Sequence, residues 1–233
     1  MNFKEEVLKL GIELKDGQLD QFEQYYRFLI EENRKMNLTA ITEQEEVYRK
    51  HFLDSLEISR ILPVGSPITL LDVGSGAGFP SVPYAIVSPD TKVTIIDALQ
   101  KRIRFLEQLT NKLRLTNVEV YHFRAEDYAK EKREFFSVVT ARAVARLNVL
   151  CELCLPLVAL NGIFIAMKGA SAQEEVREAE KAMEALGGKL EKQLSIELPE
   201  QHEKREIIVI RKVRKTPACY PRRFAMIKER PIV

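Results

Sequence analysis

The stretch that most constrains the fold runs from Ile68 to Pro80. Its first six residues, 68–73, are mostly apolar and predict a buried strand. Three glycines follow within residues 74–78, and a helix is expected to begin at Pro80. Glycine is required where a backbone takes a positive φ angle or lies close to a ligand. A strand, a glycine-rich turn and a helix in this order form a ligand-binding unit at the carboxyl edge of a parallel sheet.

Two details of the turn separate the cofactor classes that use such a unit. A dinucleotide fingerprint has glycine at its sixth position, where this chain has Phe79. An acid, Asp72, precedes Gly74, Gly76 and Gly78, and this pattern resembles the first motif of methyltransferases that use S-adenosylmethionine (AdoMet). AdoMet carries a sulfonium and an ammonium cation, which acidic groups attract, whereas they would repel a pyrophosphate.

Strands and helices alternate after residue 68, which is typical of a parallel sheet with helices on both faces. Strands are expected at 68–73, 92–97, 118–121, 136–140 and 163–167, and helices at 80–88, 101–113, 145–155 and 172–186. Two further strands, at 189–196 and 205–211, have no helix between them and should pair as a hairpin. We therefore expect an α/β fold with the seven-stranded, doubly wound, Rossmann-like sheet of AdoMet-dependent methyltransferases.

The first part of the chain has a different pattern. Apolar residues recur at helical spacing over 18–35 and again over 45–60, and a segment with proline and glycine at 63–67 ends this part. We expect three parts: a small N-terminal helical appendage at 1–62, a methyltransferase domain at 63–213 and a basic C-terminal tail at 214–233.

Composition is that of an ordinary globular protein, with an uneven distribution of charge. Hydrophobic residues make up 45% of the chain, and no apolar run approaches the roughly 20 residues of a membrane span. The N-terminus lacks the apolar region of a signal peptide and three cysteines do not suggest a disulfide framework, so a cytoplasmic location is expected. Residues 201–233 carry a net charge of +7 and residues 1–200 one of −5. The tail is therefore either a surface for nucleic acid or a solvated tail.

Polar residues after the second and third strands are candidates for binding a nucleoside. Asp97 ends the second strand, 23 residues after Gly74, where such sheets place a carboxylate on the ribose hydroxyls. The alternative role is the N-cap of the following helix. Ala125 and Glu126 follow the third strand and either contact the adenine ring or begin a short helix near Tyr128.

The end of the fourth strand bears on the type of reaction. Methyltransferases that modify an exocyclic amine have Asn/Asp-Pro-Pro-aromatic here, whereas this chain has Thr140-Ala141-Arg142-Ala143. Those that modify carbon 5 of a pyrimidine need a cysteine nucleophile beside proline, and this chain has no cysteine in that context. This favours an acceptor that is already nucleophilic, such as a ring nitrogen with a lone pair. Arg142 and Lys168 end the fourth and fifth strands and are expected to hold phosphate.

Two other groups have structural interpretations. Cys151 and Cys154 lie on one helix without a second pair, so buried thiols are expected there rather than a metal site. His51 lies on the apolar face of a helix, where a packed histidine is more usual than a catalytic one.

A series of motifs, in order along the chain, matches one known family. The segments are Asn37–Ile41, His51–Leu56, Asp72–Pro80, Lys101–Leu106, Arg124–Glu126, Arg142-Ala143, Ala166–Gly169 and Thr216–Arg222. Together they resemble the glucose-inhibited division protein B family, whose members methylate guanine N7 in bacterial small-subunit (16S) ribosomal RNA. The glycine turn alone indicates only an AdoMet enzyme, but the whole set in this order is highly specific.

The resemblance implies an enzyme that transfers a methyl group from AdoMet to N7 of a guanine in 16S rRNA and releases S-adenosylhomocysteine. It implies cofactor contacts at Gly74, Phe79, Ala125, Glu126 and Arg142, with Asp97 on the ribose. Near the substrate it implies His51, Asn37 and Thr39. In this interpretation the catalytic positioning residues are Arg142, Lys168 and His51, and the further RNA contacts are Arg102, Arg222 and Arg223.

The chain departs from the family pattern at two places: Ser81 stands where glycine is usual, and the sequence after Arg223 differs from a Gly-Thr-Pro-like run. The expected partner is 16S rRNA or the small ribosomal subunit. No membrane and no obligate protein partner are expected, and the protein is expected to be a monomer. Three other interpretations stay open: a nicotinamide-dependent oxidoreductase, a non-catalytic RNA-binding factor, and a methyltransferase that acts on another RNA or a small molecule.

Overall fold

The computed structural model describes residues 1–142, 145–169, 172–200 and 202–233, so Ala143 of the sequence motif lies outside the described residues. A seven-stranded sheet has the order β3-β2-β1-β4-β5-β7-β6. Its strands are β1 (Thr69–Val73), β2 (Lys92–Asp97), β3 (Val118–His122), β4 (Phe136–Arg142), β5 (Val158–Lys168), β6 (Gly188–Glu197) and β7 (Lys204–Lys212). The α/β fold predicted from the alternating pattern is confirmed.

Strand β1 lies inside the sheet between β2 and β4, and the order of the strands reverses beside it. Leu71 of β1 pairs in parallel with Thr94 of β2 on one side and with Val139 of β4 on the other. In doubly wound sheets a crevice opens outside the carboxyl ends of the strands at this point of reversal. The glycine turn that follows β1 therefore lies where this kind of fold binds its ligand.

The last two strands form the expected antiparallel hairpin, in which β7 pairs with β5 and β6 forms the edge of the sheet. Ile165 of β5 pairs with Val209 of β7, and β6 pairs with the other edge of β7. The middle of β7 is a buried apolar run, Ile207–Ile210, whereas most of β6 is exposed or half-buried. The more apolar strand takes the interior position because an interior strand is covered on both faces.

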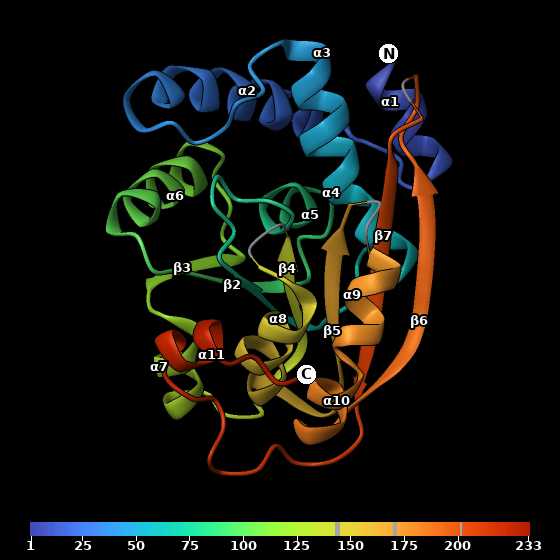
Figure 1. Ribbon diagram of the computed structural model, residues 1–233. Helices are drawn as coiled ribbons and strands as arrows, with labels where there is room; N and C mark the ends of the chain where they lie inside the picture. The colour runs from blue at the N-terminus through green and yellow to red at the C-terminus, as the bar shows by residue number, and fades with distance from the viewer. Residues whose placement is uncertain (143–144, 170–171, 201) are drawn as a thin grey trace.

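Successive residues of β1 supply two different cores because side chains alternate between the faces of a sheet. Leu70 packs with Val82 and Phe105, and Leu71 packs in the other core with Leu150. Figure 1 shows α5 and α6 on one side of the sheet and α7 to α11 on the other. The helices are α5 (Ser81–Val87), α6 (Gln100–Lys112), α7 (Ala125–Glu131), α8 (Leu147–Cys154), η3 (Leu155–Leu157), α9 (Ala172–Glu178), α10 (Glu180–Ala185) and α11 (Phe224–Glu229).

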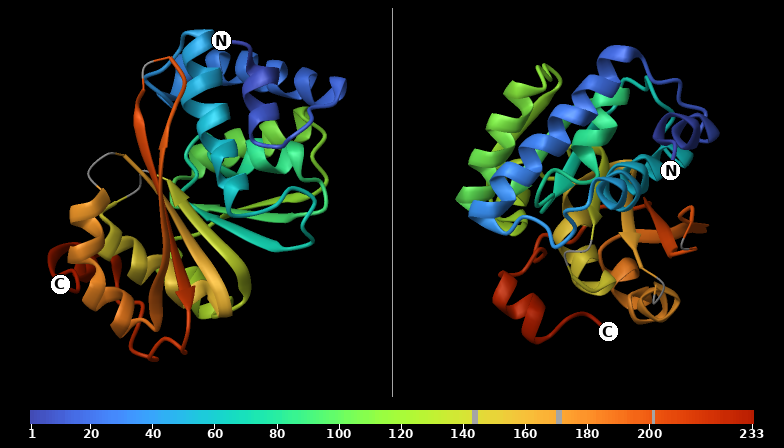
Figure 2. Two further views of the ribbon diagram at one scale, coloured as in Figure 1. Left: turned by 90° about the vertical axis from the view of Figure 1, so that its right-hand side faces the viewer. Right: turned by 90° about the horizontal axis from the view of Figure 1, so that it is seen from above.

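The N-terminal part is helical, as its spacing predicts, and it packs on the face that α5 and α6 cover (Figure 2). Its elements are α1 (Phe3–Lys9), α2 (Asp16–Met36), α3 (Gln44–Val47), the π-helical η1 (Tyr48–Leu53), α4 (Asp54–Leu56) and the 3-10 helix η2 (Glu57–Arg60). The ring of Tyr25 on α2 lies 5.0 Å from that of Phe52 and 5.4 Å from that of Phe79. These helices thus share a core with the glycine turn, and the boundary at residue 62 stays a prediction.

Several helices differ from the expectation. The segment 172–186 holds two helices that meet at Ala179, and α1 and α11 come in addition to the predicted set, while α7 is the short helix left open near Tyr128. Helix α7 begins at Ala125, three residues before Tyr128, and its N-cap residue makes no side-chain capping bond. Among the described residues, no helix is both long and apolar enough to span a membrane.

Candidate active site

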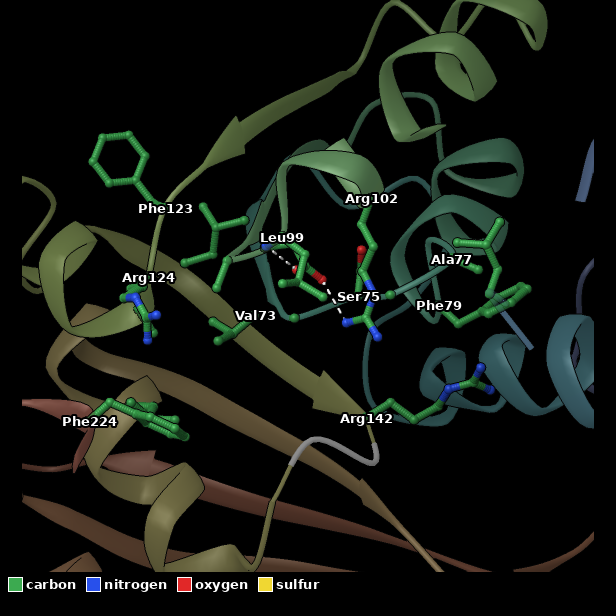
Figure 3. Close-up of a pocket in the computed structure, with 18 of the residues that line it drawn as sticks. Val73, Ser75, Ala77, Phe79, Leu99, Arg102, Phe123, Arg124, Arg142 and Phe224 are labelled. Carbon is green, nitrogen blue, oxygen red and sulfur yellow. Dashed lines mark hydrogen bonds and ion pairs between the residues drawn. The ribbon is translucent and has the colours of Figure 1, made fainter. Parts of the chain in front are cut away.

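A cavity of about 480 Å³ opens at the carboxyl ends of β1, β2 and β4, and this size is typical of small-molecule sites. Its walls are the glycine turn, the loop after β2, the residues after β3 and part of the N-terminal helices. Figure 3 shows Phe79 and Arg142 at one end and Arg124 and Phe224 at the other. We call this space the first cavity.

The glycine turn is fixed from behind by helix α2. Gly78 has a φ of +101°, and a Cβ atom there would lie 2.7 Å from the Tyr25 hydroxyl oxygen and 2.8 Å from Val82. The same hydroxyl donates a hydrogen bond of 2.5 Å to the Ala77 carbonyl oxygen. Gly76 faces open space, with a φ of +63° and nothing within 4 Å of a Cβ atom. Gly74, Gly76 and Phe79 therefore line the cavity, while Gly78 permits the close packing beneath it.

Asp72 lies under the turn and is not part of the cavity wall. It is fully buried, and its Oδ2 accepts a hydrogen bond of 3.3 Å from the Ser81 amide. Burial raises the pKa of Asp72 to about 7. The carboxyl group thus supports the start of α5, at the residue where the chain departs from the family pattern.

Asp97 lies on the cavity wall at the end of β2, and it also shapes the loop that leads into α6. Its Oδ1 accepts a hydrogen bond of 2.9 Å from the Leu99 amide, and its Oδ2 lies 3.3 Å from Nη1 of Arg102. Arg102 lines the same cavity and is half-exposed. The N-cap residue of α6 is Leu99, so the alternative that Asp97 caps this helix is wrong. Its binding of a ribose stays a prediction.

The opposite end of the cavity is formed after β3. Phe123, Arg124, Ala125 and Glu126 line it, as expected for the last two residues. Phe224 of α11 also lines this end, although its position in the tail gave no such indication.

An ion pair between half-buried Arg222 and buried Glu152 holds the tail in this place. Arg222 donates through Nε to Oε1 of Glu152 at 2.8 Å and through Nη2 to Oε2 at 2.6 Å. Glu152 is fully buried on α8. Arg222 thus has a structural partner, whereas Arg223, also predicted to contact RNA, is exposed at the start of α11.

His51, Phe79 and Arg142 form a stacked group at the other end. The His51 ring lies 4.6 Å from that of Phe79 at an angle of 24°, and the Arg142 guanidinium carbon lies 4.8 Å from the same ring. The His51 Nε2 atom lies 2.8 Å from Oγ1 of Thr39. Burial and the charge of Arg142 lower the pKa of His51 to about 4, so the imidazole is neutral at pH 7.

A second cavity, of about 590 Å³, adjoins the first and shares His51 and Arg142 with it. Lys168 lines this second cavity, and its Nζ lies 2.7 Å from Oε2 of Glu175. The predicted catalytic residues Arg142, Lys168 and His51 thus meet here, whereas the predicted cofactor residues other than Asp72 and Gly78 meet in the first cavity. Asn37 lines neither cavity; it is exposed and ends α2 with a φ of 52°.

Asp54, which was not among the predicted site residues, also lines the second cavity. Arg142 Nη1 donates to its Oδ2 at 2.9 Å. The available signal was its position three residues after His51, because residues at this spacing share a helix face. The buried thiols of Cys151 and Cys154 are confirmed, and no cluster able to hold a metal ion occurs in the part of the chain that the structure describes.

Comparison with solved structures supports the fold. The similar structures include a SAM-dependent methyltransferase from Aquifex aeolicus, with a TM-score of 0.54, 18% identity, and coverage of 73% of this chain and 94% of that chain. TYW2 from M. jannaschii, solved in complex with AdoMet, has a TM-score of 0.53 and 16% identity over 68% of this chain and 74% of that one.

Comparison by sequence is more specific. The family model GidB, described as rRNA small subunit methyltransferase G, matches residues 18–208. A "Ribosomal RNA small subunit methyltransferase G" of Bacillus cytotoxicus is 52% identical over 95% of this chain and 94% of its own length. That of Bacillus cereus strain ZK is 50% identical over 99% of this chain and 97% of its own length. With this identity over nearly all of both chains, the protein belongs to the GidB family.

Proposed function

We propose that this protein transfers a methyl group from AdoMet to N7 of a guanine in the 16S rRNA of the bacterial small subunit. The observation that carries the proposal is the family match over residues 18–208, because it includes the residues of both cavities except Phe224. The Rossmann-like sheet with its glycine turn supports the same class of enzyme.

The first cavity fits AdoMet in size and in chemistry. No atom lies within 4 Å of the position that a Cβ atom would take on Gly76, so a ligand can lie against the backbone there. Two carboxylates, Asp97 and Glu126, line the cavity together with three arginines. Carboxylates can accept hydrogen bonds from the ribose hydroxyls and the ammonium group of AdoMet. We propose that AdoMet is held by Gly74, Gly76, Phe79, Asp97, Ala125 and Glu126. When bound, AdoMet supplies an activated methyl group on its sulfonium.

The residues at the junction of the cavities position the reactants rather than move protons. N7 of guanine carries a lone pair and no proton, so its methylation requires no general base. His51 is neutral and its Nε2 is occupied by Thr39, which agrees with a positioning role. Arg142 is held by Asp54 and by the Phe79 ring, so its guanidinium has a fixed orientation between the two cavities.

Exposed cations beside the site suit an RNA substrate. Arg146 lines the second cavity, where it is exposed and paired with Glu178, and Arg223 lies exposed in the tail next to Phe224, which lines the first cavity. Contacts of this kind with phosphate provide affinity that falls with salt. We further propose that the enzyme acts as a monomer in the cytoplasm, where small ribosomal subunits are present.

The test is transfer of labelled methyl groups from AdoMet to small ribosomal subunits that lack their native methylation. Label at one site, released by aniline cleavage at 7-methylguanine, is the expected result. Label at another atom would keep the methyltransferase activity and contradict the N7 assignment. Binding of RNA without transfer would favour the non-catalytic factor, and an absorbance change with NADH would favour the oxidoreductase.

A further inference from the structure

His51 lines both cavities, and the protein itself engages both of its ring nitrogens. Its Nδ1 atom lies 3.2 Å from the Lys50 carbonyl oxygen, and its Nε2 atom lies 2.8 Å from Oγ1 of Thr39. One face of the ring stacks on Phe79. The imidazole at the junction of the cavities is therefore fixed at two edges and on one face.

The partners of the two nitrogens decide where the ring proton lies. A carbonyl oxygen has no hydrogen to give, so Nδ1 is the donor to Lys50. His51 is neutral at pH 7 and carries one ring proton, which leaves Nε2 as an acceptor. The Thr39 hydroxyl therefore donates to Nε2. In this arrangement His51 is the Nδ1–H tautomer.

Thr39 is itself held by its side chain and by its backbone. Its Oγ1 accepts a hydrogen bond of 3.0 Å from the Ile41 amide, in a local turn of the kind that threonine often forms. The Thr39 amide donates at 2.8 Å to Oδ1 of Asn33 on α2. The hydroxyl thus accepts from one side and donates to His51 on the other, and hydrogen bonds in such a chain strengthen one another.

The other end of this chain lies in the π-helical segment η1, which contains Lys50. The amide four residues after Lys50, that of Asp54, donates to the carbonyl oxygens of Arg49 and His51. The Lys50 carbonyl oxygen accepts from the His51 ring and, at 3.4 Å, from Nη1 of Arg142. π-Helical turns are frequent at functional sites, and this one directs a backbone acceptor at both junction residues.

We propose that Thr39 is a positioning residue that fixes His51 as the Nδ1–H tautomer, so that the imidazole directs no N–H group at the acceptor nitrogen. The role at the acceptor rests on the proposed function, whereas the tautomer follows from contacts within the protein. Guanine N7 needs its lone pair to form the bond to the methyl group. An imidazole N–H at the junction would donate to that lone pair and oppose the reaction. With both ring nitrogens of His51 engaged, the lone pair stays free.

The tautomer is measured by long-range proton–nitrogen NMR correlations of the imidazole rings, which suits a chain with three histidines. The variant His51→Gln identifies the signals of this ring by their loss. At pH 7 we expect widely separated shifts of the two ring nitrogens in the wild type, with the proton on Nδ1. In Thr39→Val the two shifts should move toward each other, because the Nε2–H tautomer becomes populated.

Kinetics separate a positioning role from direct contact with a ligand. Thr39→Val should lower kcat on small ribosomal subunits roughly 5- to 10-fold, about the effect of one lost hydrogen bond, and should leave KM and AdoMet affinity nearly unchanged. Thr39→Ser keeps the hydroxyl and should keep the wild-type kcat and tautomer. Thr42→Val is the matched control, because Thr42 is exposed nearby in the chain and lines neither cavity.

The outcomes separate this inference from the proposed function. A wild type that methylates no guanine would reject the proposed function and with it the role at the acceptor, while NMR still decides the tautomer. A wild-type proton on Nε2, or shifts in Thr39→Val that stay as far apart as in the wild type, would overturn the assignment to Thr39.

Direct contact between Thr39 and a ligand would also overturn it. In that case Thr39→Val would weaken AdoMet binding or raise KM, and the His51 shifts would not change. A Thr39→Ser variant as slow as Thr39→Val would show that the hydroxyl is not the group that matters. Calorimetry with AdoMet checks that each variant is folded.

Discussion

At the scale of single residues, Phe79 connects the parts of the site. Its ring contacts Tyr25 of α2, His51 of η1 and Arg142 of β4. A glycine at this position, as in a dinucleotide fingerprint, would remove the surface on which the other side chains stack. The sequence placed Phe79 near the cofactor, but its contacts come from segments far apart in the chain, so the pattern could not reveal them.

His51 gives a prediction about pH. The unfolded chain protonates His51 near pH 6.5, whereas the pKa in the folded protein is lowered to about 4. Between these values the unfolded state binds the additional proton, so acidification through this window favours unfolding. We expect the free energy of unfolding of the wild type to fall by up to roughly 3 kcal/mol more than that of His51→Gln between pH 7 and pH 4. Urea titrations at both pH values measure this, and equal losses would contradict it.

The glycine turn predicts how much two alanine substitutions lower the free energy of unfolding. Gly78→Ala places a methyl group 2.7 Å from the Tyr25 hydroxyl oxygen, whereas Gly76→Ala meets nothing within 4 Å and adds only the strain of its positive φ. We expect Gly78→Ala to cost about 3 kcal/mol and Gly76→Ala about 1 kcal/mol of unfolding free energy. Thermal and urea denaturation compare the two. An equal cost would mean that Tyr25 does not pack against the turn as described.

At the scale of elements, the tail is part of the cofactor site. Strand β2 has the bounds that the sequence predicted, because its apolar run has clear ends and pairs with neighbours on both sides. Helix α11 was not predicted, because its short sequence has weak helical signals and its place depends on the pairing of Arg222 with Glu152. Asp54 was missed for a related reason: its environment is assembled from β4 and β7.

Phe224 tests this role of the tail. Its side chain lines the first cavity, whereas Met226, which lies on the same helix and is also exposed, does not line it. We expect Phe224→Ala to weaken AdoMet binding by roughly 5- to 10-fold through lost apolar contact, and Met226→Ala to leave it nearly unchanged. Isothermal titration calorimetry with AdoMet measures both. Equal affinities for the two variants would remove Phe224 from the site.

At the scale of the whole molecule, one sheet edge gathers residues from both ends of the chain. The fold could be predicted because hydrophobic periodicity and the glycine turn are local signals. The division of the site into two cavities could not, because Arg142 and His51 meet only after α2, η1 and β4 have packed together. Asp72 is a residue that the sequence pattern misplaced. It was predicted among the cofactor ligands, but the fold buries it under the turn, where it bonds to the Ser81 amide.

The uneven charge of the chain gives a prediction at this scale. Arg223 and Lys228 are exposed in a tail that lies beside the first cavity. If each contacts an RNA phosphate, Arg223→Ala and Lys228→Ala should each reduce the slope of log affinity against log salt by about 1. Lys189→Ala, on the outer strand β6, is the control and should keep the slope. Filter binding to small subunits at several salt concentrations measures it, and unchanged slopes would favour a merely solvated tail.

We propose that the cofactor occupies the first cavity and the guanine the second, with His51 and Arg142 between them. A crystal structure with S-adenosylhomocysteine bound tests it most directly. We predict that the nucleoside lies between Asp97 and Ala125 and that the sulfur atom faces the junction at His51 and Arg142. Binding in the second cavity, or a sulfur atom that faces away from this junction, would show that the cofactor and the base do not lie as proposed.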